Sequence, residues 1–409
     1  MARTLHVWLL GHRVGELLQD DSGQLQFRYL DEWLALSDAM PLSVSLPLQK
    51  ESFPQKLARP FFAGLLPEES NRSIIAAAFG VSKSNDFALL DRIGGECAGA
   101  VTLMPEGELA GGAETPLYHP MDEAALSKLF SELPKRPLLA GEQGLRLSLA
   151  GAQSKMALAR IGDSYALPLN GAPSTHILKP PSPRFASLVE NECFCMELAA
   201  ASGLSAPKVR VGQTGSHPFL EIERYDRVFR PDGTVERLHQ EDFCQALGVV
   251  PEMKYQVEGG PGLKQCFELL RNVSSVPAVD LLRLFDAVVF NFLIGNSDAH
   301  GKNFSLLYHG GEVRLAPLYD LVCTQAYPEL STEMAMKLGG ERDPKRIGTK
   351  NWSRFSEETG LGQPVALRRL RSLAQQVRGA VDTLAPKFAA VTSAPEIVRA
   401  NCERLLSQS

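Results

Sequence analysis

The sequence predicts an α+β fold with two lobes, in which strands dominate the first half of the chain and helices the second. Two observations support this prediction. Before residue 225, short runs of alternating apolar residues are separated by turn-forming residues, a pattern that is typical of strands. After residue 226, apolar residues recur every three or four positions over ten residues or more, as they do in amphipathic helices.

The composition is that of an ordinary globular protein of 409 residues, with 44% hydrophobic and 22% charged residues. The net charge of −5 and the isoelectric point near 6.0 argue against a strong nucleic-acid binder that acts alone. Seven cysteines without a Cys-x-x-Cys pair indicate free thiols in a reducing compartment. No signal peptide is apparent, and the most apolar run, Ala287–Gly295, is too short to span a bilayer. We therefore expect a cytoplasmic protein with no membrane partner.

Changes in pattern along the chain divide it into four regions. Residues 1–104 are predicted to form a small β-rich subdomain that completes the first lobe, with a β-meander at its start and further alternation at 42–48. Residues 105–140 are predicted as a linker region, because glycine, glutamate and proline are frequent near its start. Residues 141–225 complete the strand-rich lobe, and residues 226–409 form the helical lobe.

Residues 141–225 are predicted to contain five strands and one helix. A loop of small residues at 148–153 precedes the first strand. Ser187 and Glu190 have the spacing of a capping box, so the helix is expected to begin there and to stop at Gly203. The strands are expected at 155–160, 164–168, 175–179, 208–213 and 218–224.

The helical lobe is predicted to contain a short strand pair as well as helices. Two strands at 303–308 and 313–317 flank a Gly310-Gly311 turn and are expected to form a hairpin. Pro277 suits the first turn of the most apolar helix. The helices are expected at 241–248, 263–273, 277–295 and 365–384.

Three oxygen-bearing side chains accompany this hairpin: Asp298 precedes it, Asn303 begins it and Asp320 follows it. Phosphoryl transfer to a hydroxyl needs a carboxylate beside the attacking oxygen, and oxygen ligands that hold Mg²⁺ against the nucleotide phosphates. In protein kinases an Asp-x-x-x-x-Asn loop, a hairpin and a further aspartate supply these groups. We therefore predict Asp298 as the catalytic carboxylate and Asn303 and Asp320 as Mg²⁺ ligands, with ATP as the phosphate donor.

The strand-rich lobe supplies the other groups that a kinase needs. Lys179 ends a predicted strand and is expected to hold the α- and β-phosphates of ATP. Glu192 is predicted to orient this lysine, in preference to Glu190, which the capping box would occupy. The backbone N–H groups of the small-residue loop at 148–154 can cradle phosphates. The predicted fold is therefore protein-kinase-like, with residues 141–225 as the nucleotide-binding part of its first lobe.

A different phosphate chemistry could begin from the same residues. The run Asp298-Ala-His300-Gly301 also opens metallophosphoesterase sites, in which aspartates and histidines bind two metal ions. Those sites need a downstream Gly-Asp and an Asn-His pair, and neither follows Gly301. The chain also has no Gly-x-Ser-x-Gly elbow of a serine hydrolase. His300 is therefore interpreted as a residue that stabilises its loop or contacts phosphate.

Seven segments carry a resemblance to a known family, and they are SLAGAQSK (Ser148–Lys155), HILK (His176–Lys179), NECFCMELA (Asn191–Ala199), ERYDR (Glu223–Arg227), HQEDFCQALG (His239–Gly248), IGNSDAHGKNFS (Ile294–Ser305) and PLYD (Pro317–Asp320). In this order they resemble the HipA family of bacterial Ser/Thr kinase toxins from type II toxin–antitoxin modules. The N-terminal β-rich region also resembles the family's N-terminal subdomain, so the resemblance covers nearly the whole chain. It implies a two-lobed fold related to lipid kinases.

The resemblance implies roles for particular residues. Ser148 matches the serine whose autophosphorylation displaces its loop and inactivates the kinase. Asp320 is followed by Leu321-Val322 where eukaryotic-type kinases have Phe-Gly, so their usual switch is missing. The implied ATP contacts lie in the phosphate loop, the strand-end lysine, the adenine-binding hinge and the catalytic loop: Ala150, Gly151, Ala152, Gln153, Ser154, Lys155, Lys179, Glu223, Arg224, Tyr225, His300, Lys302, Asn303 and Asp320.

The resemblance also implies partners. These are a HipB-like dimeric helix-turn-helix antitoxin, operator DNA reached through the antitoxin, and a protein substrate of translation such as an aminoacyl-tRNA synthetase, whose phosphorylation leads to growth arrest and persistence. A competing function is an antitoxin-bound DNA co-repressor with weak or lost kinase activity. Residues 342–378 include nine basic and three acidic residues, and Arg368, Arg369 and Arg371 among them could touch a DNA backbone.

Overall fold

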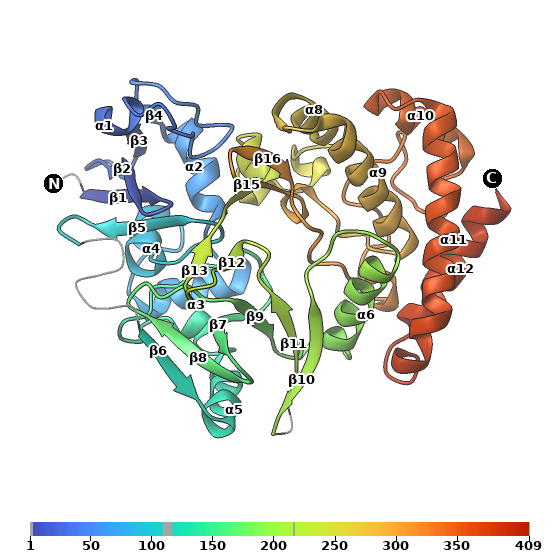
Figure 1. Ribbon diagram of the computed structural model, residues 1–409, viewed down its shortest axis with the longest axis horizontal. Coiled ribbons are helices and arrows are strands. Elements are labelled where there is room, and N and C mark those ends of the chain that lie inside the picture. Colours follow the sequence, from blue (N-terminus) through green and yellow to red (C-terminus); the bar gives the residue numbers. More distant parts are fainter. Residues whose placement is uncertain (1–2, 109–116, 216, 409) are drawn as a thin grey trace. The chain divides into compact units, whose positions relative to one another are not determined.

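The computed structural model describes residues 3–108, 117–215 and 217–408. These residues divide into two compact units (Figure 1). The strand-rich unit consists of Met1–Pro180, Gly212–Pro251 and Leu307–His309, and the helical unit consists of Pro181–Val211, Glu252–Leu306 and Gly310–Ser409. Both kinds of element predicted from the sequence are present, so the α+β class is confirmed.

The strand-rich unit begins with a five-stranded sheet in the order β4-β3-β2-β1-β5, in which all neighbours are antiparallel. The predicted meander is therefore correct. The Phe27 ring packs in the core of this region against two other aromatic rings. Its centroid lies 6.0 Å from that of Phe53 and 5.4 Å from that of Phe62. The elements are β1 (Arg3–Leu9), β2 (His12–Gln19), β3 (Leu25–Tyr29), α1 (Asp31–Leu34), β4 (Phe53–Pro54), α2 (Gln55–Gly64), α3 (Glu69–Ala78), α4 (Asp86–Ile93) and β5 (Val101–Pro105).

The alternation at 42–48 does not form a strand of this sheet, contrary to expectation. Its only pairing is an isolated bridge between Ser43 and Leu46. The Tyr29 hydroxyl accepts a hydrogen bond from the Leu42 amide at 2.7 Å and donates one to the Leu46 carbonyl at 2.6 Å. A buried side chain thus satisfies the backbone groups that a neighbouring strand would otherwise pair.

A second sheet has the order β10-β11-β9-β7-β8-β6. It confirms the five strands predicted between residues 155 and 224. The region 105–140, predicted as a linker, contains β6 and α5, and residues 109–116 of it lie outside the described residues. The elements are β6 (Leu117–Met121), α5 (Glu123–Glu132), β7 (Met156–Ile161), β8 (Ser164–Leu169), β9 (His176–Lys179), β10 (Val209–Thr214, which belongs to this unit from Gly212 on) and β11 (His217–Glu223).

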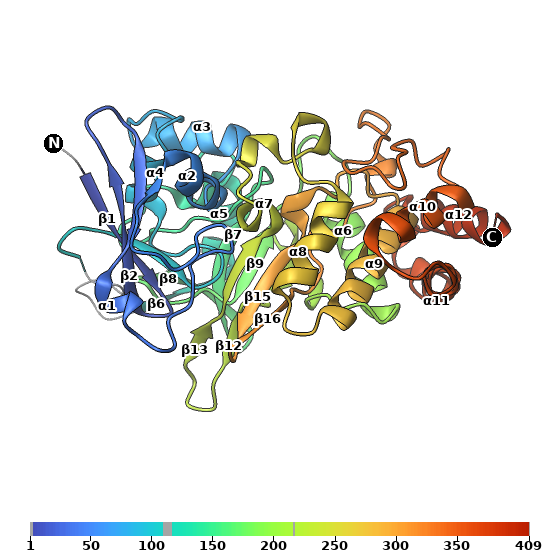
Figure 2. The same ribbon diagram turned by 90° about the horizontal axis from the view of Figure 1, so that it is seen from above.

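The remaining part of the strand-rich unit follows β11. The strands β12 (Arg227–Phe229) and β13 (Val235–Arg237) form an antiparallel hairpin (Figure 2). The helix predicted at 241–248 is shorter than expected. Its first two residues belong to strand β14 (His239–Asp242), and the helix α7 spans only Phe243–Ala246. Asp242 caps α7 through a capping box with Gln245.

The helical unit is built around α11 (Gln363–Phe388), which packs against α6, α9, α10 and α12 (Figure 1). Four side chains of its predicted apolar stripe, Leu370, Leu373, Val377 and Val381, are buried. The predicted hairpin is present as β15 (Ser305–His309, of which Leu307–His309 belong to the strand-rich unit) and β16 (Glu312–Leu315). The other helices are α6 (Leu188–Ala201), α8 (Leu263–Val273), α9 (Pro277–Leu293), α10 (Thr349–Thr359) and α12 (Ala394–Ser407).

The capping box predicted at the start of α6 does not form. Ser187 has a left-handed backbone with φ of 53° and makes no capping hydrogen bond with its side chain. A capping serine normally has an extended backbone, which aims its hydroxyl at the first free amides of the helix. Instead, the carbonyl of Ala186 accepts a hydrogen bond from the Tyr327 hydroxyl at 3.2 Å, so tertiary contacts set this helix start.

All seven cysteines are buried and free, as the sequence indicated. Burial raises the pKa of Cys266 to about 12, so this thiol stays protonated and unreactive near neutral pH. Among the helices in the described ranges, none combines the length and the apolarity needed to cross a bilayer.

A buried carboxyl group in the strand-rich unit predicts a pH-dependent stability. Glu241 accepts hydrogen bonds from the Val44 amide at 3.0 Å, the Tyr308 hydroxyl at 2.5 Å and the Ser43 hydroxyl. Burial raises the pKa of Glu241 from 4.5 to about 7. The folded chain therefore holds this proton more tightly than the unfolded chain, and the associated stability is lost as the pH rises toward and through 7.

We expect Glu241→Gln to remove this pH dependence, because glutamine resembles the protonated acid and keeps an acceptor for Val44. The free energy of unfolding of the wild type should fall relative to that of the variant between about pH 5 and 8. The neighbouring His239 does not confuse the comparison, since burial lowers its pKa to about 4. Urea unfolding of both proteins at several pH values measures the difference, and parallel pH profiles would contradict the assignment.

Candidate active site

The segment after α9 places Asp298 in the helical unit. Gly295 has a left-handed backbone with φ of 66°, which lets the chain leave the helix. The Asn296 side chain donates to Asn291 Oδ1 at 2.8 Å and accepts from the Asp298 amide at 3.1 Å. Asp298 is exposed, and its Oδ1 accepts a hydrogen bond from the Tyr255 hydroxyl at 2.7 Å. A rigid turn therefore presents an exposed carboxylate.

Asn303 and Asp320 lie together, as the spacing predicted. Asn303 Nδ2 donates to Asp320 Oδ2 at 3.0 Å, and Asn303 Oδ1 accepts from the His300 amide at 3.1 Å. Asp320 has a left-handed backbone with φ of 57°, which is uncommon for a residue other than glycine and concentrates at functional sites. The hairpin of β15 and β16 therefore brings Asp320 back beside Asn303.

This pair of side chains suits a magnesium ion. The ion prefers hard oxygen ligands and takes only one or two from the protein when nucleotide phosphates complete its shell. Asp320 offers a carboxylate, and the amide oxygen of Asn303 keeps a second lone pair beside its bond to His300. Within the described residues there is no group of three or more His, Cys, Asp or Glu arranged to hold a metal. A magnesium ion shared with a nucleotide does not need one.

The loop predicted to bind phosphates lies in the strand-rich unit and is held from several sides. Ser148 is completely buried, its hydroxyl donates to the Leu65 carbonyl at 2.7 Å, and its amide donates to the Glu96 carbonyl at 2.8 Å. Asn71 Nδ2 donates to the Ala152 carbonyl at 2.8 Å. The N-terminal region of the chain therefore fixes the shape of this loop.

Gly151 is required inside this loop. Its φ is 102°, and a side chain at this position would approach Lys155 Nζ to 2.8 Å. Lys155 Nζ donates to the Ala150 carbonyl at 2.6 Å, so the amine lies folded over the loop. The loop backbone and the charged amine of Lys155 therefore lie together, with no bulky side chain at Gly151. Such a site suits an anionic ligand. Gln153 and Ser154 complete the turn into β7 and are partly exposed.

Lys179 and Glu192 occupy the elements predicted for them. Lys179 ends β9, is only 5% exposed and pairs across the sheet with Leu220 of β11. Glu192 lies in α6 of the helical unit and is completely buried. Glu190 is partly exposed. The preference for Glu192 rested on a capping box that does not form, but its burial gives an independent reason, since a buried carboxylate needs a charged or hydrogen-bonding partner.

The hinge predicted at Glu223, Arg224 and Tyr225 contains a buried ionic network that the sequence did not reveal. Arg224 donates to both carboxylate oxygens of Asp226, at 2.9 and 2.8 Å. Glu96 accepts from Arg227 at 2.9 Å and from the Ser174 amide at 2.9 Å. Nearby arginines hold the pKa of Asp226 far below its ordinary value despite its burial. The Arg224 side chain is thus held within this network.

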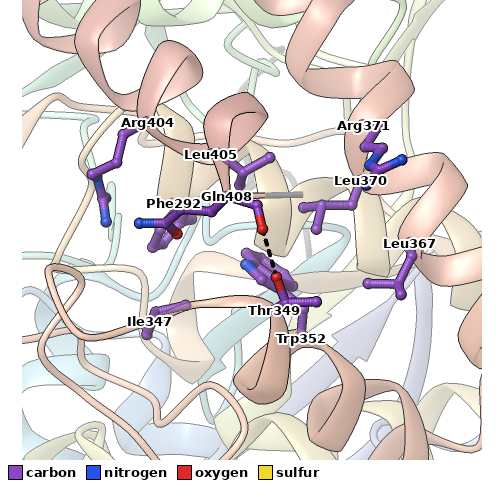
Figure 3. Close-up of a pocket in the computed structure, with 10 residues that line it drawn as sticks. All are labelled: Phe292, Ile347, Thr349, Trp352, Leu367, Leu370, Arg371, Arg404, Leu405 and Gln408. Carbon is purple, nitrogen blue, oxygen red and sulfur yellow. Dashed lines mark hydrogen bonds between the residues drawn. The ribbon is translucent and has the colours of Figure 1, made fainter.

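A pocket elsewhere in the helical unit is separate from these residues (Figure 3). Its wall is largely apolar, with Phe292, Trp352 and Leu370 among its side chains, and Arg371 and Arg404 lie on opposite sides of it. Thr349 donates to the Gln408 carbonyl at 2.9 Å along one edge. None of the predicted catalytic, metal-binding or ATP-binding residues lines this pocket, whereas Arg371, a candidate DNA contact, does.

The strand-rich unit has a small-residue loop and a strand-end lysine, and the helical unit has an Asp-x-x-x-x-Asn loop and a further aspartate. These are the parts expected of a protein kinase. The chain belongs to the HipA family of serine/threonine kinases. The model of the HipA N-terminal domain matches residues 5–104, and that of the HipA-like C-terminal domain matches residues 147–383. The resemblance noted in the sequence is therefore confirmed.

Individual relatives are similar over most of the chain. A putative kinase, Y4mE, of Sinorhizobium fredii is 51% identical over 93% of this chain and 91% of its own length. The serine/threonine-protein kinase toxin HipA of Shewanella oneidensis is 30% identical over 92% of this chain and 88% of its own. The solved complex of Shewanella oneidensis HipA with HipB and operator DNA contains a chain with a TM-score of 0.85 and 28% identity, covering 99% of this chain and 98% of that one.

Proposed function

We propose that this kinase is the toxin of a toxin–antitoxin module, that it uses Mg²⁺ and ATP, and that it phosphorylates a serine or threonine of a protein involved in translation. The observation that carries the catalytic part is the cluster in the helical unit, where Asn303 lies 3.0 Å from Asp320 in the segment that also presents Asp298. The toxin role is supported by similarity to the Shewanella oneidensis toxin.

The proposed chemistry assigns a task to each group. The oxygen of the substrate hydroxyl forms a bond to the γ-phosphorus of ATP, and Asp298 accepts the proton of that hydroxyl. At the same time, the bond between the γ-phosphorus and the bridging oxygen breaks, and ADP leaves. Asn303 and Asp320 would hold Mg²⁺, which neutralises charge on the phosphates when bound. Lys179 and the backbone amides of the Ser148 loop would hold the phosphates, and Glu192 would orient the lysine.

We also propose that Ser148 is an autophosphorylation site that turns the enzyme off. Its complete burial supports a switch rather than a simple surface modification, because the loop must leave the Leu65 and Glu96 carbonyls before phosphate can be added. The added phosphate carries nearly two negative charges. A loop with that charge cannot return to a buried position or cradle the phosphates of ATP.

The toxin role can be tested by growth. Induced expression of the wild type should stop growth of the bacterial host, and expression of Asp298→Asn should not. Co-expression of a HipB-like helix-turn-helix antitoxin from the proposed module should restore growth. Normal growth with abundant, folded wild-type protein that phosphorylates itself in vitro would leave the kinase intact but contradict the toxin role.

A second function, co-repression, is favoured by the solved Shewanella oneidensis complex, which contains operator DNA. On α11, Arg368 and Arg371 are exposed, whereas Arg369 donates to both carboxylate oxygens of Asp286 at 2.5 Å. The predicted three-arginine contact is thus reduced to two side chains. Arg368→Ala with Arg371→Ala should weaken operator binding of the antitoxin complex and lower its salt dependence. Unchanged binding in a gel-shift titration at two salt concentrations would exclude a DNA contact here.

A further inference from the structure

Tyr255 contacts two residues of the catalytic segment at once. Its hydroxyl donates to Asp298 Oδ1 at 2.7 Å, and its ring lies edge-on to the His300 ring, with centroids 5.1 Å apart. The tyrosine is 43 positions away in sequence, in the segment that precedes α8. Both contacts lie inside the helical unit.

The backbone around Tyr255 is held in a tight double turn. Two short turns, Pro251–Met253 and Gln256–Glu258, flank it, and its carbonyl accepts from the amides of Glu258 at 3.0 Å and Gly260 at 2.9 Å. A side chain at Gly260 would lie 2.2 Å from the Met253 carbonyl oxygen, so only glycine fits there.

A side-chain contact anchors the same turn to the rest of the unit. Gln256 Oε1 accepts from the Lys337 amide at 2.7 Å. With its backbone fixed on both sides and its ring against His300, the phenol of Tyr255 is pre-organised to meet the carboxylate of Asp298.

Resting on the proposed kinase chemistry, we propose that Tyr255 is a positioning residue that fixes the carboxylate of Asp298 for proton transfer from the substrate hydroxyl. A carboxylate has about four lone-pair sites, so one bond from Tyr255 leaves it able to accept the substrate's proton. Asp298 is exposed, so a hydrogen bond from a fixed donor restricts the rotamers that its side chain can adopt. A hydrogen bond that holds the carboxylate in one orientation keeps it placed to accept the proton of the substrate hydroxyl.

The hydrogen bond also has an electrostatic consequence. A donor to a carboxylate favours its charged form, which is the form that can accept a proton. Removal of the donor should therefore move the acid limb of the activity profile to higher pH. A role confined to packing would not produce this movement. The other ionisable groups of these segments, Lys254, His300, Lys302 and Asp320, are present in both proteins, and Tyr255→Phe keeps the ring that contacts Lys254 and His300.

The test is Tyr255→Phe, which removes only the hydroxyl and keeps the ring beside His300. We expect kcat for phosphoryl transfer to fall about 5- to 10-fold, KM for ATP to change less than twofold, and the acid limb of kcat to move up by about half a pH unit or more. The matched control is Tyr118→Phe, which removes a hydroxyl that donates to the Pro173 carbonyl at 3.1 Å in the strand-rich unit. This control should match the wild type.

Each other outcome has a distinct meaning. An active wild type with a Tyr255→Phe variant of equal kcat and equal pH profile would overturn the positioning role. A rise in kcat/KM would also overturn it, because the phenol would then compete with the substrate hydroxyl for Asp298. A wild type without any phosphoryl transfer would instead contradict the proposed kinase chemistry. Thermal melting of the variants confirms that they are folded.

Discussion

We expect Asp298→Asn to lower kcat for phosphoryl transfer by at least about 100-fold. Asparagine has nearly the same shape, and its amide oxygen can still accept the hydrogen bond that Tyr255 donates at 2.7 Å. It cannot take a proton from the substrate hydroxyl, so transfer loses its base while the segment stays in place. KM for ATP should change little, because Asp298 is not assigned to the nucleotide.

A matched control separates loss of chemistry from loss of fold. Asp382 is an exposed aspartate of α11 that pairs with Arg399 at 3.1 Å, and Asp382→Asn should keep wild-type activity. Rates of γ-phosphate transfer and melting temperatures of both variants provide the measurement. An Asp298→Asn variant within about threefold of the wild type would remove Asp298 from the mechanism.

The second large effect concerns the metal. We expect Asp320→Asn to raise the Mg²⁺ concentration for half-maximal activity at least about tenfold and to reduce kcat at saturating Mg²⁺, because a neutral amide replaces the charged ligand. Asparagine is the appropriate substitution, since Asp320 has a φ of 57° and asparagine tolerates left-handed backbone better than most residues. With alanine at this position, the effect of backbone strain could not be separated from the effect of losing the metal ligand.

The Mg²⁺ titration needs a comparison with nucleotide binding in the absence of metal. ATP binding measured without Mg²⁺ should be nearly equal in the wild type and in Asp320→Asn. Binding measured with Mg²⁺ should be weaker in the variant alone. An unchanged Mg²⁺ dependence of activity would show that Asp320 does not bind the ion, even if the rate were lower.

Local sequence patterns predicted most of the fold because they report burial directly. The alternation of the first thirty residues and the apolar stripe of α11 both correspond to faces that pack against the core. The spacing of Asn303 and Asp320 correctly predicted that these two side chains lie together, for a similar reason. A short loop and a hairpin with a two-residue turn leave the chain few ways to place Asn303 and Asp320, which meet at 3.0 Å.

Long-range contacts decided what the sequence could not show. Glu96 and Arg227 are 131 positions apart and form a buried pair, so no local pattern links them. At Ser187 the Ser-x-x-Glu pattern was present, yet the contact between Tyr327 and the Ala186 carbonyl accompanies a left-handed start to α6. A local motif predicts a preference that tertiary packing can override.

The most direct test of the central claim, that Asp298 serves a kinase whose off-switch is Ser148, is to incubate the purified chain with Mg²⁺ and ATP and to map phosphate by mass spectrometry. The wild type should carry one phosphate on the peptide that contains Ser148, and Asp298→Asn should carry none. Absence of phosphate from the wild type, or equal labelling of Asp298→Asn, would contradict the account.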